Sequence, residues 1–208
     1  PLLNYSNVLD SVEHITSPQG LGMSAQRITV STAGIAKMIK KLGDDNVKFN
    51  LALSLHAATD VKRSQIMPIN ETNDLKSLIE ALNYFYQKTE NEITLEYILF
   101  DNFNDSFEDA AELIKVYRQI PADLVNIIEY NPIDNGTFRQ AGEDKLRMVQ
   151  HLLESHGITT RIRKSRGKDI DAACGQLRSE SVKLRASERA KATNGARGDR
   201  WRRPPCAA

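Results

Sequence analysis

The sequence predicts an α/β fold in which parallel strands form part of a (β/α) barrel. Five short apolar or β-branched stretches alternate with helical patterns, and helices between strands imply right-handed crossovers and a parallel sheet. No glycine-rich phosphate loop of the Rossmann or Walker type is present to favour a doubly wound sheet. Polar residues follow several of the strands, and barrels bind their ligands at the carboxyl ends of strands.

The individual elements follow from apolar spacing and from cap residues. Strands are expected where β-branched and apolar residues run together, at 27–32, 47–55, 93–100, 124–130 and 158–163. Helices are expected where apolar residues recur every three or four positions, at 8–15, 35–43, 74–85, 106–120 and 142–156. Asp74 is suited to cap the third of these helices, and Gly157 closes the last.

Composition divides the chain in two. Residues 1–177 carry the alternating pattern and have the size of one ordinary domain, so we expect them to form the barrel portion and a loop with a cysteine. Residues 178–208 contain few large apolar side chains and hold nine basic against three acidic residues. Such a segment buries too little apolar surface to offset the entropy of ordering, so we predict a disordered basic tail.

Two classes of protein are disfavoured. No apolar run reaches the length of a membrane span and no leader-like segment opens the sequence, so we expect a cytoplasmic protein that does not contact a membrane. The two cysteines, Cys174 and Cys206, form neither a disulfide framework nor a zinc-binding pattern.

Cys174 is the residue best suited to chemistry. Five cations lie between Arg161 and Lys168, and nearby positive charge lowers the pKa of a thiol and favours the nucleophilic thiolate. Gly175 leaves the thiol open to approach. The same cations would suit an RNA phosphate backbone, and they stand out because residues 1–160 hold 14 basic and 22 acidic side chains. For a lone cysteine, a small buried residue beside a solvated basic face is the more common arrangement.

Six collinear motifs lie within residues 1–177: Pro1–Tyr5, Arg27–Thr32, Leu53–Ala57, Met67–Asn70, Asn126–Pro132 and Asp169–Leu177. Together they resemble a family of bacterial radical S-adenosylmethionine RNA methyltransferases. The family is the dual-specificity one that methylates carbon 2 of an adenine in 23S ribosomal RNA and in certain tRNAs. A related enzyme, which methylates carbon 8 of a neighbouring ribosomal adenine and confers antibiotic resistance, is the alternative within this class.

The resemblance implies an S-adenosylmethionine site at the strand ends, formed by Ser31, Ser54, Leu55, His56 and Asn131. Hydroxyl and amide groups suit the ribose and the zwitterionic methionine end of that cofactor. Other roles stay open from the residues alone. The serines could satisfy backbone groups where strands end, Asn131 could belong to a turn, and His56 could be a packed histidine with a satisfied ring nitrogen.

The resemblance also implies a mechanism. Cys174 would take a methyl group from one S-adenosylmethionine. A second one, cleaved by a [4Fe–4S] cluster with electrons from a donor such as flavodoxin, would supply the radical that activates this methyl group. A second cysteine would then release the methylated adenine, in 23S rRNA or tRNA, through a disulfide with Cys174.

The chain departs from the family pattern. The Cys-x-x-x-Cys-x-x-Cys cluster motif and the resolving cysteine are not in this sequence, and of a Gly-Glu-Pro segment only Pro1 is present. We therefore expect a C-terminal fragment that lacks the first strand or strands, binds no metal and is inactive alone. Cys206 is read as an accidental thiol in the tail.

Other residues suggest less. Glu96 is a lone strand carboxylate without an evident partner for acid-base chemistry, and the histidines other than His56 are expected to be structural. A different class remains open, in which the chain is a non-catalytic RNA-binding fragment whose footprint is the basic stretch and tail.

Overall fold

The computed structural model describes residues 1–132 and 137–164. The chain falls into two compact units, and the first of them, Pro1–Tyr130 with Phe138–Lys164, contains all the described helices and strands. Asn131–Thr137 belongs to the second unit. The cysteine loop around Cys174 and the predicted tail at 178–208 lie outside the described residues.

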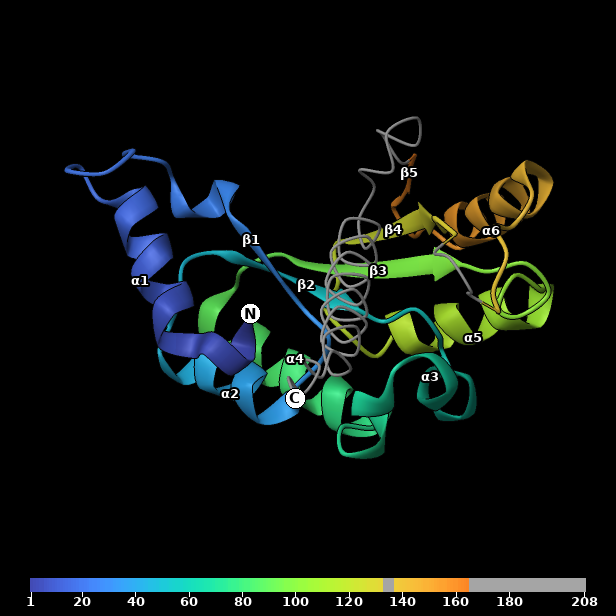
Figure 1. Ribbon diagram of the computed structural model, residues 1–208, viewed down its shortest axis with the longest axis horizontal. Helices are drawn as coiled ribbons and strands as arrows, with labels where there is room; N and C mark the ends of the chain where they lie inside the picture. Colours follow the sequence, from blue (N-terminus) through green and yellow to red (C-terminus); the bar gives the residue numbers. More distant parts are fainter. Residues whose placement is uncertain (133–136, 165–208) are drawn as a thin grey trace, which may run out of the picture. The chain divides into compact units, whose positions relative to one another are not determined.

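A five-stranded parallel sheet lies at the centre of the first unit (Figure 1). Its strands are β1 Thr29–Thr32, β2 Asn50–Ser54, β3 Ile93–Leu99, β4 Leu124–Glu129 and β5 Thr160–Arg163. They pair in the order of the sequence and every neighbouring pair is parallel. A doubly wound sheet would reverse its strand order at a switch point, whereas a barrel adds each strand to the same side of the last. The sheet is therefore an arc of a (β/α) barrel, which confirms the predicted fold class.

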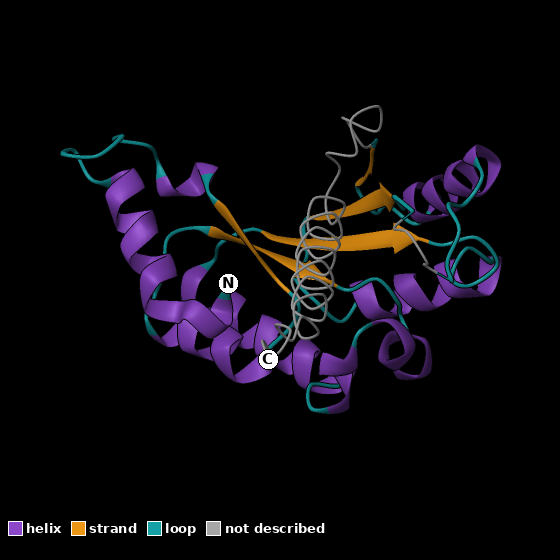
Figure 2. Ribbon diagram, in the orientation of Figure 1, coloured by secondary structure: helices purple, strands orange, loops and turns teal. Residues whose placement is uncertain are grey.

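Helices connect the strands (Figure 2). They are α1 Tyr5–Thr16, α2 Ala36–Asp44, α3 Asp60–Ile66, α4 Leu75–Thr89, α5 Phe107–Tyr117 and α6 Glu143–Ser155. In the first unit α2 packs against α4 and α5 against α6. Asp74 caps α4 as predicted, because its Oδ1 accepts from the Ser77 N–H at 2.8 Å. Within the described residues no helix has the length and apolar character that crossing a bilayer requires.

The apolar core lies on one face of the sheet. Leu53 on β2, Leu95 on β3 and Ile127 on β4 project to this face and are fully buried. Leu82 and Phe85 of α4 are equally buried and join the same cluster. Each such side chain contributes about 1.5–3 kcal/mol by leaving water, so this face accounts for most of the stability and the opposite face is free to carry polar groups.

Two glycines permit close packing. In the turn after β1, Gly34 has φ +96°, and a Cβ there would lie 2.9 Å from Cδ2 of Leu78. In α2, a Cβ on Gly43 would lie 3.3 Å from Cα of Phe85, so α2 and α4 cross with little between their backbones. The turn after β1 is thus held tightly against α4.

The structure refines the predicted boundaries. Strand β1 begins at Thr29 because Ala25–Arg27 form a 3-10 turn, and β2 covers only Asn50–Ser54 of the predicted strand at 47–55. Helix α3 and the 3-10 turn Pro68–Glu71 were not predicted at all.

Candidate cofactor site at the strand ends

A row of polar side chains crosses the face of the sheet opposite the apolar core. Ser54 on β2 is in register with Glu96 on β3, and Glu96 is in register with Asn126 on β4. Asn126 in turn pairs with Arg161 on β5. Residues in register on parallel strands project to the same side, so these four form one row. Ser31 on β1 lies on the same face, one row earlier.

Glu96 anchors this row. Glu96 is 7% exposed, and its Oε1 accepts a hydrogen bond of 3.0 Å from Nδ2 of Asn126. Both carboxylate oxygens lie 3.4 Å from Nη1 of Arg163, which comes from β5. Glu96 seemed alone in the sequence because its partners are 30 and 67 residues away. Its charge therefore ties β3 to β4 and β5 across the polar face.

The two serines are not used to satisfy the backbone. Neither the Ser31 nor the Ser54 hydroxyl has a hydrogen-bond partner among the described residues. Thr32 serves the backbone instead, since its Oγ1 accepts from the Gly34 N–H at 3.1 Å. Both serine hydroxyls are thus free to bind a ligand, and the structural role that the sequence left open for them falls to Thr32.

His56 is held in an unusual conformation after β2. Its φ is +56°, its Nδ1 accepts from the Ile98 N–H at 3.2 Å, and its carbonyl accepts from Nδ2 of Asn104 at 2.8 Å. Burial lowers the pKa of the imidazole to about 4, and the nearby charge of Arg63 adds to this. The ring is therefore neutral at pH 7, with its proton on Nε2. The Ile98 N–H satisfies Nδ1, and a hydrogen bond with the Glu96 backbone partly opposes the lowering of the pKa.

Leu55 and Asn131 are placed differently from the serines. The Leu55 side chain is fully buried, its N–H donates to the Glu96 carbonyl at 2.9 Å, and its carbonyl accepts from Arg63. Asn131 follows β4 directly and belongs to the second unit. Its Oδ1 is buried without a hydrogen-bond partner in the described part of the chain. A buried amide oxygen of this kind is costly unless a ligand or water satisfies it.

Two hydroxyls of the first unit, those of Ser31 and Ser54, can donate or accept and lack a partner in the described chain. Asn131 belongs to the second unit, and its Oδ1 can accept. Free polar groups of this kind are what a polar, nucleoside-like ligand needs. The assignment of these residues to S-adenosylmethionine stays a prediction.

An iron–sulfur cluster finds no such fit among the described residues. Within 1–132 and 137–164 no group of three His, Cys, Asp or Glu side chains could hold a metal ion. Cys174 and Cys206 lie outside these ranges.

The described part of the basic stretch is largely neutralised. Arg163 pairs with Glu96, and Lys164 lies 3.5 Å from Glu143 on α6. The charge of Lys164 is the main reason why the pKa of Glu143 is lowered. Arg161 is exposed and is the cation of this described segment that forms no ion pair.

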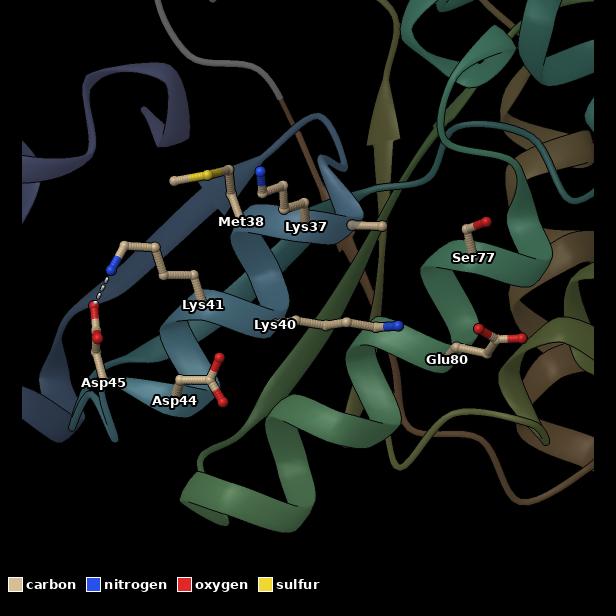
Figure 3. A pocket seen from close by; sticks show the side chains of 9 residues that line it. Lys37, Met38, Lys40, Lys41, Asp44, Asp45, Ser77 and Glu80 are labelled. Atoms are coloured by element: carbon tan, nitrogen blue, oxygen red, sulfur yellow. Dashed lines mark hydrogen bonds and ion pairs between the residues drawn. The ribbon is translucent and has the colours of Figure 1, made fainter.

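An open groove lies away from the sheet, between α2 and α4 (Figure 3). It measures about 610 Å³. Its three lysines lie on α2, and α4 contributes Ser77 and Glu80. Lys41 is already paired with Asp45 at 3.1 Å.

Comparisons with known proteins give the family of the chain. No family model matches the chain. The "Probable dual-specificity RNA methyltransferase RlmN" of Christiangramia forsetii is 56% identical over 182 residues, which are 88% of this chain and 51% of that protein. The protein of the same name from Cytophaga hutchinsonii is 56% identical over 183 residues, 88% of this chain and 50% of that protein. The "Dual-specificity RNA methyltransferase RlmN" of Nautilia profundicola is 38% identical over 182 residues, 88% of this chain and 51% of that protein.

Solved structures give the same result. A radical SAM methyltransferase from Sphaerobacter thermophilus matches with a TM-score of 0.80 and 35% identity, over 85% of this chain and 51% of that one. A domain of pyruvate-formate lyase-activating enzyme from Bacteroides vulgatus matches with a TM-score of 0.59 over 78% of this chain and 93% of that one. At 13% identity this second likeness shows the fold alone.

The arc of parallel strands, with free polar groups at the strand ends, and the likeness to a solved methyltransferase define part of a radical S-adenosylmethionine methyltransferase. The chain spans about half the length of the curated relatives it matches. More particularly, over that shared segment it belongs to the RlmN family of dual-specificity RNA methyltransferases.

Proposed function

We propose that this chain is the methyl-carrying part of an enzyme that methylates carbon 2 of an adenine in 23S ribosomal RNA and in tRNA, in the cytoplasm. The observation that carries the proposal is 56% identity over 88% of the chain with a protein named as a dual-specificity RNA methyltransferase. The unpartnered hydroxyls of Ser31 and Ser54 support it, because a cofactor-binding site needs polar groups that the fold does not use.

Each free group has a task in binding the cofactor, which when bound supplies a transferable methyl group and, on reductive cleavage, a radical. Ser31 and Ser54 hydrogen-bond its ribose hydroxyls or its methionine end. His56 remains neutral, so it adds no positive charge beside the sulfonium. Asn131 lies in the second unit and is proposed from the resemblance, and its buried amide oxygen can accept a hydrogen bond.

Cys174 is proposed as the methyl carrier. Its thiolate would accept the methyl group that S-adenosylmethionine supplies when bound, with the demethylated thioether leaving. Positive charge nearby favours the thiolate. Since Arg163 and Lys164 already have carboxylate partners, we expect less of this effect to come from them than the sequence suggested.

The remaining parts belong to the whole protein. The [4Fe–4S] cluster and a reducing partner such as flavodoxin are proposed for the full-length enzyme, whose relatives are about twice as long as this chain. Among the described residues no three His, Cys, Asp or Glu side chains are grouped so that they could hold a cluster.

The proposal is tested by mass spectrometry of Cys174. The chain is joined to the first half of the Christiangramia forsetii relative, expressed, purified without oxygen and digested. We expect a mass increase of one methyl group on the peptide that contains Cys174. Cys206→Ala serves as the matched control and should keep that methyl group, whereas Cys174→Ala should lose it. An unmodified Cys174 in a protein that carries its cluster would contradict the proposal.

A further inference from the structure

Arg63 of α3 lies beneath the strand ends and joins two of them. It is fully buried and heads the largest fully buried side chains of the described residues. Its Nη2 donates to the carbonyl of Ala33, after β1, at 2.8 Å and to that of Ser54, the last residue of β2, at 3.4 Å. Its Nε donates to the carbonyl of Leu55 at 3.2 Å. One guanidinium therefore bonds the backbone at the ends of two strands, β1 and β2, that carry the predicted cofactor residues Ser31 and Ser54.

The Nη1 side of the guanidinium also has two hydrogen-bond acceptors. Nη1 donates to Oδ1 of Asn70 at 2.7 Å and to the carbonyl of Asn73 at 3.4 Å. Asn70 is in turn fixed by Asp60, whose Oδ1 accepts from its Nδ2 at 3.0 Å. All five acceptors of Arg63 are neutral, and within the described residues Arg63 forms no ion pair. Charge pairing alone does not explain why a cation is buried here.

We propose that Arg63 is a positioning residue that holds the turn after β1 and the turn after β2 in one fixed arrangement, and so sets the separation of Ser31, Ser54 and His56. The inference rests on the proposed function, since the ligand served by these turns is S-adenosylmethionine. A planar guanidinium with five donors in a fixed fork can span two turns, whereas a lysine ammonium is a point charge on a flexible stem.

A role in packing alone makes a different prediction. If Arg63 only fills the core, its substitution weakens the whole sheet. The amides of every strand then lose protection from hydrogen exchange together. If Arg63 is a positioning residue, its substitution raises amide exchange first at the two turns that it bridges and only later in the central strands β3 and β4.

The test compares Arg63→Lys and Arg63→Met with Arg147→Met in the full 208-residue chain. Arg147 is the matched control because it lies on α6 and pairs only with Glu143 at the surface. Amide hydrogen exchange is followed at 31–34 and 54–56, with Leu95 and Ile127 as core references. Arg63→Lys keeps the charge and most of the volume, so it decides the matter if Arg63→Met does not fold.

In Arg63→Lys we expect exchange at both turns to rise at least about tenfold relative to the core references, and Arg147→Met to match the unaltered chain. The proposal would be overturned if both turns exchange as in the unaltered chain. It would also be overturned if protection from exchange falls uniformly across the sheet. Titration with S-adenosylmethionine, followed by amide shifts, should show weaker binding to Arg63→Lys. If the unaltered chain shows no shifts, the proposed function loses its support, while the exchange pattern still decides whether Arg63 couples the turns.

Discussion

His56 should make the stability of the chain depend on pH well above the range where carboxylates titrate. Folding lowers the pKa of His56 from 6.5 to about 4. Between these pH values the imidazole is protonated in the unfolded chain and neutral in the folded chain. Stability is therefore full above pH 6.5 and is lost as the pH falls toward 4. The shift corresponds to about 3 kcal/mol in all, or roughly 1.4 kcal/mol per pH unit in the middle of the range.

The variant His56→Asn isolates this effect. Asparagine tolerates the positive φ of +56°, and its side-chain oxygen can accept from the Ile98 N–H in place of Nδ1. We expect the variant to be within about 1 kcal/mol of the unaltered chain at pH 7 and to lack the loss between pH 6.5 and 4.5. Carboxylates with lowered pKa values, such as Asp45 and Glu143, affect both proteins alike and act at lower pH.

Urea unfolding followed by circular dichroism at half-unit steps from pH 7 to 4.5 measures the difference, and an NMR titration of the imidazole gives the pKa directly. Parallel stability curves for the two proteins would refute the argument. So would an imidazole that titrates near 6.5, because burial and the charge of Arg63 would then not act on it.

Two further substitutions and one reconstitution test other parts of the structure. Gly34→Ala should cost about 1–3 kcal/mol in urea unfolding, because of its φ of +96° and the 2.9 Å approach to Leu78, whereas Gly142→Ala meets nothing within 4 Å and should cost less than about 1 kcal/mol. Glu96→Gln should cost about 1 kcal/mol or less, because the side chain of Arg163 is 62% exposed, and the cost should shrink at high salt. Anaerobic iron–sulfur reconstitution of the 208-residue chain alone should leave no stoichiometric cluster by absorbance, and a full cluster would contradict the expectation.

Apolar periodicity predicted the elements that bury apolar side chains. All five strands and the helices α2, α4, α5 and α6 were expected close to their observed bounds, because each turns a regular apolar stripe toward the core. Helix α3 was missed for a physical reason. Its buried residue is Arg63, and Val61 is 74% exposed, so the helix has no apolar stripe to detect.

The polar site was harder to predict than the fold. Ser31, Ser54 and His56 were found through a resemblance in motif, since isolated serines at strand ends carry little signal of their own. The partners of Glu96 could not be predicted, because Asn126 and Arg163 meet it only through the register of three strands. Arg63 gave no sign of its bridging role, because its acceptors are mostly backbone carbonyls, which every sequence has.

The most direct test of the central claim is the position of the methyl group on the RNA product. The chain, joined to the first half of its Christiangramia forsetii relative and supplied with its cluster, S-adenosylmethionine and a reductant, is incubated with 23S ribosomal RNA or tRNA. Nucleosides from the digested RNA are then identified by mass spectrometry against synthetic standards. We expect 2-methyladenosine in both RNAs, and none with Cys174→Ala. A product methylated at carbon 8, or RNA that is bound but never methylated, would contradict it.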